Sequence, residues 1–468
     1  MKKLIIFSSI ITMIVPLFAL ETHSTQELFY SYLKNDSDIR NLTIEAEKSQ
    51  LSYDSTKLNN GFDITLSTGT IKLSTTGSNS SLNISGAGVT ATVPQAQNLK
   101  LSTSTSMDIT NRENQSSSTR LSLSADIISG NSITRKISLM KAERTLLEAK
   151  RKLENAALTA EKSFYNELKS LLNSTSSLIT AESNLYKDTI DFESTKAKGY
   201  STSSSTYRLA QMKVISDQHD IESQKRELAR DYMIFYKKCG LEITLDENTD
   251  FYSLIPTDLQ KVTALNIEDF DADKFSTTEK ALWNHEINSL SRSAEKNFTL
   301  SANGGYTFKT AGDTVDAGLS STIGGVNLSA GISVPVSGES KDPTYTLSAT
   351  ISPMTFLKNK NKQKTNDLTE EQELLEIENA RSEYETTVME KKQKLMELDW
   401  TKSTNQESYE MYQELEKEMK QYYQQGIIKE SEYRSAEVNV KNYKVKLASN
   451  EIDYIIYNNE LQTLFVNE

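Results

Sequence analysis

The stretch that decides the fold is residues 298–351, FTLSANGGYTFKTAGDTVDAGLSSTIGGVNLSAGISVPVSGESKDPTYTLSATI. Apolar residues alternate with Ser, Thr, Asn or Gly in four runs, which are separated by turn-forming stretches such as 311–313 and 338–343. Alternation between such turns predicts β-strands with one apolar and one small polar face. The clearest alternating apolar positions are Phe298, Leu300, Ala302, Val315, Ala317, Leu319, Val326, Leu328, Ala330, Tyr345, Leu347 and Ala349.

A second window, residues 61–128, has the same character with less regularity. It also contains four alternating runs. Their register slips near Gly69, and Gly86 and Gly88 indicate a β-bulge. The 17 glycines fall almost entirely in these two windows, and the others are Gly199, Gly240 and Gly426. Because glycine is costly inside helices and useful in turns, the pattern predicts two β-windows and two long helical regions, arranged as an internal duplication.

The helical regions contain unusually long segments. Residues 131–198 and 357–425 contain neither Gly nor Pro, and at about 1.5 Å per residue each predicts a helix of roughly 100 Å. The return helices, near 201–239 and 429–465, are shorter. The second long segment carries two seams of apolar residues at heptad-like spacing, which predicts neighbours on both sides, as in a ring of helices. An ordinary antiparallel coiled coil is the alternative.

Residues 1–20 are typical of a secretory signal, with Lys2 and Lys3 followed by an apolar run from Leu4 to Leu20. An uncleaved anchor helix is the alternative, at the short limit for a membrane span. The net charge of −12 and the lack of a basic block argue against nucleic-acid binding. One cysteine, Cys239, and three scattered histidines predict neither a disulfide nor a metal site.

Strands of about ten residues with one apolar face are typical of transmembrane β-barrels, whose apolar face meets lipid and whose polar face meets water. A soluble sandwich with an apolar core would give the same alternation. The secretory signal and the long helices favour the barrel.

The chain resembles the TolC-like outer-membrane efflux protein family over nearly its whole mature length. Residues 33–39, LKNDSDI, are similar to the opening motif of that family, with Ser37 at the usual proline. The most specific match is Tyr423-Gln424-Gln425-Gly426, which resembles the family's Tyr-x-x-Gly turn at the periplasmic tip. Gly199 falls at the equivalent turn of the first half.

The resemblance implies an α+β fold in which a trimeric transmembrane β-barrel continues into a periplasmic α-helical barrel. It implies an outer-membrane exit channel of a tripartite efflux or type I secretion system in a diderm bacterium. The partners would be two further copies, outer-membrane lipid, a periplasmic adaptor (membrane fusion) protein and an inner-membrane transporter. By the same resemblance, Gly199, Tyr423, Gly426 and Glu432 would form the tip constriction and the adaptor-docking site. Ile428 and Ser435 depart from the family's polar tip residues. No catalytic residue, cofactor or metal is implied.

The predicted organisation has four parts. They are a signal peptide, 1–20; a first repeat, 21–240, with a helix at 24–59, barrel strands at 61–128 and a long helix pair at 131–239 turning near 199; a linker, 241–275; and a second repeat, 276–468, with a helix at 276–296, strands at 297–352 and a helix pair at 357–465 turning near 426. The family usually has two strands per half, whereas each window here has four runs. The extra runs could enter the barrel or form extracellular hairpins.

Two other functions are compatible with the sequence. A surface structural or adhesive protein could use the same scaffold without a pump. A hydrolase is disfavoured because no nucleophile–base pair, phosphate loop or metal cluster is present. The acidic net charge also suggests an acidic lumen that favours cations.

Overall fold

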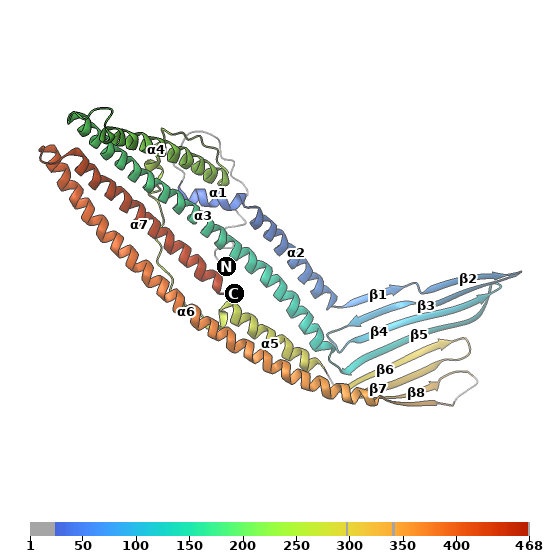
Figure 1. The fold of residues 1–468 in the computed structure, drawn as a ribbon. Coiled ribbons are helices and arrows are strands. Elements are labelled where there is room, and N and C mark those ends of the chain that lie inside the picture. Colours follow the sequence, from blue (N-terminus) through green and yellow to red (C-terminus); the bar gives the residue numbers. More distant parts are fainter. Residues whose placement is uncertain (1–23, 296–297, 339–341, 467–468) are drawn as a thin grey trace. The chain divides into compact units, whose positions relative to one another are not determined.

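The computed structural model describes residues 24–295, 298–338 and 342–466 (Figure 1). The predicted signal peptide, 1–20, lies outside these residues. The helices are α1 (Thr25–Asn35), α2 (Ser37–Asn59), α3 (Asn131–Ala197), α4 (Ser205–Lys238), α5 (Ser276–Ala294), α6 (Pro353–Gln424) and α7 (Glu430–Leu464). The strands are β1 (Asp63–Ser67), β2 (Thr70–Thr76), β3 (Asn79–Val93), β4 (Leu99–Thr110), β5 (Glu113–Ile128), β6 (Phe298–Lys309), β7 (Thr314–Ile323), β8 (Val326–Pro335) and β9 (Thr344–Ile351).

Long helices and an antiparallel sheet confirm the predicted α+β class. The two longest helices, α3 and α6, have 67 and 72 residues, and α6 begins at Pro353, a residue favoured in the first helical turn. Among the described residues, every helix is too short or too polar to cross a membrane.

The chain forms two compact units. Residues up to 39, 156–267 and 391–463 make unit 1, which is helical apart from its connecting segments. Residues 40–155, 268–390 and 464 onwards make unit 2, which holds the whole sheet and the adjoining helices.

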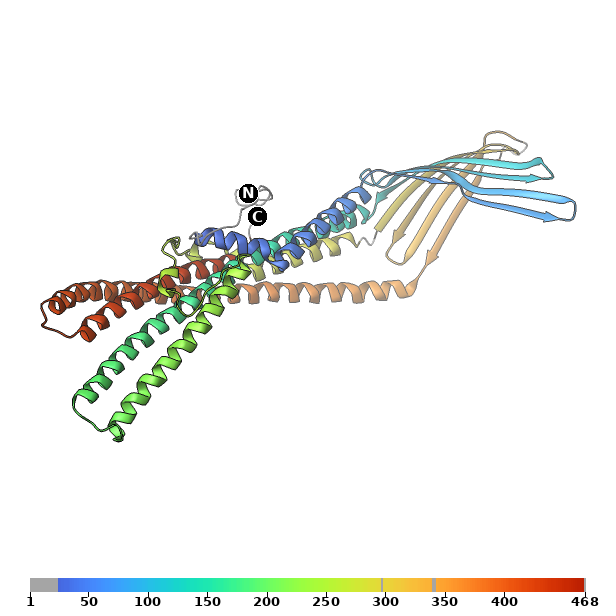
Figure 2. The same ribbon diagram turned by 90° about the horizontal axis from the view of Figure 1, so that it is seen from above.

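The sheet of unit 2 joins both β-windows. Its strands pair antiparallel in the order β1-β3-β4-β5-β6-β7-β8-β9, with β2 also paired to β3 (Figure 2). The two windows meet where β5 pairs with β6, for example at Leu121 opposite Tyr306. The first window has five strands, whereas the sequence predicts four runs. The extra strand arises because the chain breaks at Gly69, where an added Cβ would lie 2.3 Å from the carbonyl oxygen of Ser85.

The register of the strands places apolar residues opposite one another on a single face of the sheet. Ile64 faces Ala91, Ala91 faces Leu101, and Leu101 faces Leu123. The predicted bulge is present, since the β3–β4 register shifts between Ile84 and Ala87. This one-residue shift keeps the apolar positions of β3 on one face, because a slip would otherwise turn half of them over. The opposite face is lined mainly by Ser, Thr, Asn and Gly, and it also carries charged residues such as Arg120 and Asp316.

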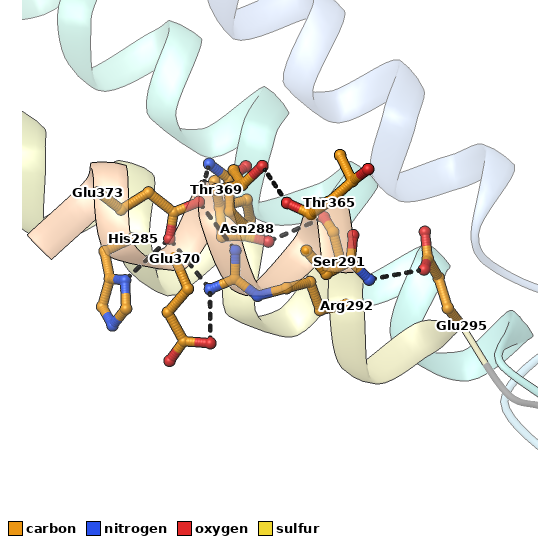
Figure 3. A network of polar contacts seen from close by, with 11 residues as sticks. His285, Asn288, Ser291, Arg292, Glu295, Thr365, Thr369, Glu370 and Glu373 are labelled. Atoms are coloured by element: carbon orange, nitrogen blue, oxygen red, sulfur yellow. Dashed lines mark hydrogen bonds and ion pairs between the residues drawn. The ribbon is translucent and has the colours of Figure 1, made fainter. Parts of the chain in front are cut away.

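The helices of unit 2 are connected by buried ions. Arg144 of α3 is 8% exposed and forms a bidentate pair with Glu279 of α5, while its guanidinium lies 5.1 Å from the ring centroid of Trp283. Glu373 of α6 is 5% exposed and accepts hydrogen bonds from both Nη atoms of Arg292 of α5 (Figure 3). These pairs place α5 between α3 and α6.

Unit 1 has an aromatic and aliphatic core. Phe164 of α3 is fully buried, and its ring lies 5.2 Å from that of Phe235 of α4 and 5.5 Å from those of Phe29 and Tyr32 of α1. The single helix predicted over 24–59 is broken in two. Asp36 leaves helical geometry at ψ 119, and its carboxylate caps the amide of residue 38 at 2.8 Å, which starts α2.

Candidate functional site

The α3–α4 and α6–α7 turns lie at the same end of unit 1 (Figures 1 and 2). Gly199 follows α3 with φ +74, and Gly426 follows α6 with φ +69. At Gly426 the amide donates to the carbonyl of Tyr423, and the next amide donates to that of Tyr422, which is a Schellman ending. Both glycines adopt the left-handed conformation that a tight helix ending needs, and a Cβ at either would meet open space.

Three of the four predicted site residues belong to the α6–α7 turn, and Gly199 belongs to the other turn. Tyr423 stacks on Tyr433 of α7, with ring centroids 5.8 Å apart and an interplanar angle of 5°. Glu432 is exposed, and among the described residues its carboxylate has no hydrogen-bond or ion-pair partner. The stack of an exposed Tyr423 on a half-buried Tyr433, beside the carboxylate of Glu432, gives this turn both an apolar and an acidic contact surface.

A cluster that the sequence reasoning missed ties α7 to α3 near this turn. Glu430 accepts a hydrogen bond from Nε of Arg434 at 2.8 Å, and the Arg434 guanidinium lies 4.0 Å from the ring centroid of Tyr186. Partial burial, and then a hydrogen bond with Glu430, raise the pKa of Tyr186. The hydrogen bonds from Tyr186 and Arg434 lower the pKa of Glu430. The i,i+4 spacing of Glu430 and Arg434 was a sequence signal, but nothing in the sequence pointed to Tyr186.

Further from the turns, one carboxylate connects three helices. Glu460 of α7 lies 2.8 Å from Nζ of Lys162 of α3, and 3.0 and 2.9 Å from those of Lys391 and Lys394 of α6. Although burial opposes ionisation, the three ammonium groups lower the pKa of Glu460 to about 2. Lys169 of α3 adds a 2.5 Å pair with Asp453 of α7. The contacts of unit 1 therefore order its helices as α4-α3-α7-α6.

The two outer helices of that order carry exposed apolar side chains. Met396, Trp400 and Met411 of α6 are each about two-thirds exposed, and they lie on the side opposite to the residues that contact α7. Leu209 and Met212 of α4 are equally exposed, opposite to the side that contacts α3. The outer helices thus have unpartnered apolar faces within the described chain.

Unit 2 repeats this feature. The outer edges of β1, β2 and β9 are unpaired among the described residues, and Leu347 of β9 is 86% exposed. On α2, Ile44, Leu51 and Leu58 form a heptad-spaced stripe that is at least half exposed. On α6, Leu368 and Leu375 are also spaced by seven residues and are more than half exposed. An apolar stripe at heptad spacing is typical of a helix that packs against another helix.

Among the described residues, no group of three His, Cys, Asp or Glu side chains comes together as metal ligands. Cys239 is buried and unpaired. Burial raises the pKa of its thiol to about 12, which makes it unreactive.

Family models of the two domains of TP096X match consecutive parts of the chain. The N-terminal domain model matches residues 28–259, and the C-terminal domain model matches residues 260–468. Between them the two models account for almost the entire chain, so it belongs to the TP096X family. No curated protein matches the sequence.

Solved structures similar to this chain are outer-membrane channels, as the sequence resemblance predicts. CusC, described for transmembrane channel formation, has 14% identity and a TM-score of 0.49, and covers 98% of this chain and 96% of its own. The open-state outer-membrane channel MtrE of Neisseria gonorrhoeae has 11% identity and a TM-score of 0.48, covering 96% and 93%. The outer-membrane protein VceC of Vibrio cholerae has 10% identity and a TM-score of 0.46, covering 95% and 97%.

Proposed function

We propose that this chain is the outer-membrane exit channel of a tripartite efflux or type I secretion system, and that it works as a homotrimer. One observation carries the proposal. In both units, the outermost helices carry exposed apolar side chains, and the outermost strands of the sheet have unpaired edges, among the described residues. A second copy offers the complementary edge in each case.

The sheet edges are compatible with pairing between copies. The chain enters the sheet from α2 into β1 and leaves it from β9 into α6, and both connections lie at the same end of the sheet (Figure 1). The β1 of one copy and the β9 of the next would therefore run antiparallel, as their neighbours in the sheet do. Such pairing would bury exposed strand edges that otherwise promote aggregation. Three copies with eight strand positions each would give a closed barrel of 24 positions.

The helix edges support the same assembly. The α6 stripe of one copy would pack against the α2 stripe of the next copy, and in unit 1 against its α4 face. Burying a Met or Leu side chain stabilises by about 1.5–3 kcal/mol, so a seam of several such residues would hold a stable oligomer. The closed sheet would turn its apolar face to lipid and its hydroxyl-rich face to a water-filled pore.

Transport through this channel would be passive, without catalysis. The helix turns with Gly199, Tyr423, Gly426 and Glu432 would extend into the periplasm and dock an adaptor protein linked to an inner-membrane transporter. Glu432 and the exposed Tyr423, which stacks on Tyr433, would supply a charged and an apolar contact for that partner.

Electron microscopy of the purified protein in detergent, with its oligomeric mass, tests the assembly. We expect a three-fold particle with a central lumen. The double variant Met396→Glu/Met411→Glu should dissociate the trimer, because it buries two charges in the seam. Gln406→Glu is the control: it adds one charge beside Glu410, to which Gln406 donates a hydrogen bond, on a side of α6 away from the seam, and it should leave the trimer intact. A monomeric wild-type particle, or a rod without a lumen, would overturn the proposal.

A surface structural or adhesive role is the alternative, and the lengths of β3 and β5 favour an additional extracellular part. They have 15 and 16 residues, whereas a membrane crossing needs about 9–11. Deleting the gene and measuring accumulation of exported compounds separates the roles. Accumulation that plasmid-borne wild type reverses supports export, and unchanged accumulation together with lost surface adhesion supports the alternative.

A further inference from the structure

We propose that the ion pair between Arg120 and Asp316 sets the charge selectivity of the pore, by keeping the hydroxyl-lined wall around it neutral. The inference rests on the proposed channel function, in which the polar face of the sheet lines the pore. The net charge of the chain suggested an acidic lumen that favours cations. The pair assigns the selectivity to two residues of the pore wall instead.

The geometry of this pair is specific. Nη2 of Arg120 on β5 lies 2.5 Å from Oδ2 of Asp316 on β7, so the arginine side chain spans the intervening strand, β6. It crosses β6 at Gly305, the residue directly opposite Asp316. A Cβ at Gly305 would lie 3.0 Å from Nη2 of Arg120 and 3.2 Å from Oδ1 of Asp316. Glycine at this position therefore gives the arginine room to cross, and the pair also links the first repeat to the second.

The residues next to the pair on this face of the sheet are uncharged. Ser122 faces Gly305 across β5 and β6, and its hydroxyl lies 2.7 Å from that of Ser102 on β4. On the other side, Ser333 of β8 faces Asp316, and Gly318 follows two residues along β7. The nearest charge on the same face of β6 is Lys309, at the end of that strand. Further along the same face, Lys100 and Asp108 of β4 lie four residues on either side of Ser104, which faces Arg120. These two flanking charges are opposite in sign, and the Arg120–Asp316 pair supplies the fixed charges around Gly305.

Both charged groups are accessible enough to act on permeating ions. The side chain of Arg120 is 42% exposed and that of Asp316 is 20% exposed. While paired, the two charges act as a dipole whose field decays within a few ångströms. Removing one partner leaves a full charge on the wall, and in a trimer this charge occurs three times around the pore. Rings of like charge are a general source of ion selectivity in pores.

The test is the reversal potential of the channel in planar lipid bilayers under a KCl gradient. We expect wild type to discriminate weakly between K⁺ and Cl⁻. Arg120→Gln should shift the permeability ratio toward K⁺, and Asp316→Asn toward Cl⁻, each on the order of two- to ten-fold. The double variant Arg120→Gln/Asp316→Asn and the exchanged variant Arg120→Asp/Asp316→Arg should both return to the wild-type ratio.

Arg112→Gln is the matched control, because it makes the same chemical change in the turn between β4 and β5. It should leave the reversal potential unchanged. A wild-type protein that forms no channel would refute the proposed function. Channels whose selectivity does not move in opposite directions in Arg120→Gln and Asp316→Asn would overturn this inference alone. Trimer mass for each variant excludes loss of assembly as the cause.

Discussion

Replacing Glu373 by Gln should loosen α5 from α6 in unit 2. Oε1 of Glu373 accepts from Arg292 at 2.8 Å and from Asn288 at 3.0 Å, and Oε2 lies 3.0 Å from Nη2 of Arg292 and 2.9 Å from Nδ1 of His285 (Figure 3). The glutamate side chain is 6% exposed and that of Arg292 is 17% exposed. Glutamine keeps the shape but leaves the guanidinium without its counter-charge. Breaking a buried pair of this kind costs about 3–5 kcal/mol, and we expect about 3 because some hydrogen bonds survive.

Hydrogen–deuterium exchange of peptides from α5 measures this change in the intact, detergent-solubilised protein. A loss of 3 kcal/mol corresponds to about a hundredfold faster exchange when local opening limits the rate. Glu370→Gln is the matched control. Its carboxylate lies 4.0 Å from Arg292 and is 53% exposed, so its removal should change exchange by less than about tenfold. Equal exchange in both variants would refute the assignment of Glu373 as the anchor of α5.

The same pair predicts a pH dependence. Hydrogen bonds from Arg292 are the main cause that lowers the pKa of Glu373 below its ordinary value of 4.5. A carboxylate with a depressed folded-state pKa stabilises the fold fully above 4.5, and this contribution is lost as the pH falls through the folded-state value. We expect the melting temperature of wild type to fall more steeply below pH 4.5 than that of Glu373→Gln. Parallel curves would contradict this account.

Four further substitutions test unit 1. Gly426→Ala should cost about 1 kcal/mol through its positive φ and speed exchange at the α6 ending, while Gly199→Ala should do the same at the α3 ending. Unchanged hydrogen–deuterium exchange at both helix endings would contradict the expectation that alanine is strained at these positive φ angles. Glu460→Gln should lower the melting temperature by a loss of about 2–4 kcal/mol, because three lysines lose their shared partner. Arg434→Gln should cost less than about 1 kcal/mol, because its pair with Glu430 is exposed; a larger loss of thermal stability would show that the cluster with Tyr186 is a structural joint.

The long elements were predictable from sequence because their physical signals are repeated many times. Alternation in 298–351 gave the strands, and the lack of Gly and Pro in 131–198 gave α3. The bulge near Gly86 followed from two glycines in one strand. The break at Asp36 was missed because it depends on one local competition, in which a side-chain cap and a ψ of 119 replace one helical turn.

The side-chain clusters were less predictable because they join residues far apart in sequence. Glu373 is 81 positions from Arg292, and Lys162 is 298 positions from Glu460. Each carboxylate lies in a segment rich in charges, and the sequence offers no means of telling a buried partner from a solvated one. The role of Gly199, Tyr423, Gly426 and Glu432 in docking stays a prediction, since conformation at a turn does not identify what binds there.

The apolar pattern of α6 shows why a single copy is an incomplete description of this protein. The sequence predicted two seams on α6, one with Leu374, Val388 and Leu395, and another with Ile377, Tyr384 and Leu398. Apart from Leu374 these named residues are half-buried, and all of them lie on one broad side of the helix. The exposed stripe of Leu368, Leu375, Met389, Met396, Trp400 and Met411 lies on the other side.

Exposed apolar residues scattered singly need no partner, but these six all lie on one side of one helix, which is typical of a contact surface. A chain that functioned alone would gain solubility from polar residues at these positions. Within unit 2 the stripe of α2, and within unit 1 the stripe of α4, offers an apolar surface of the same kind to the α6 of a second copy. Head-to-tail contacts of this kind give a closed ring when the rotation between copies closes, and the proposed trimer is such a ring. In the proposed trimer, the exposed apolar residues of α2, α4 and α6 would therefore be buried between copies.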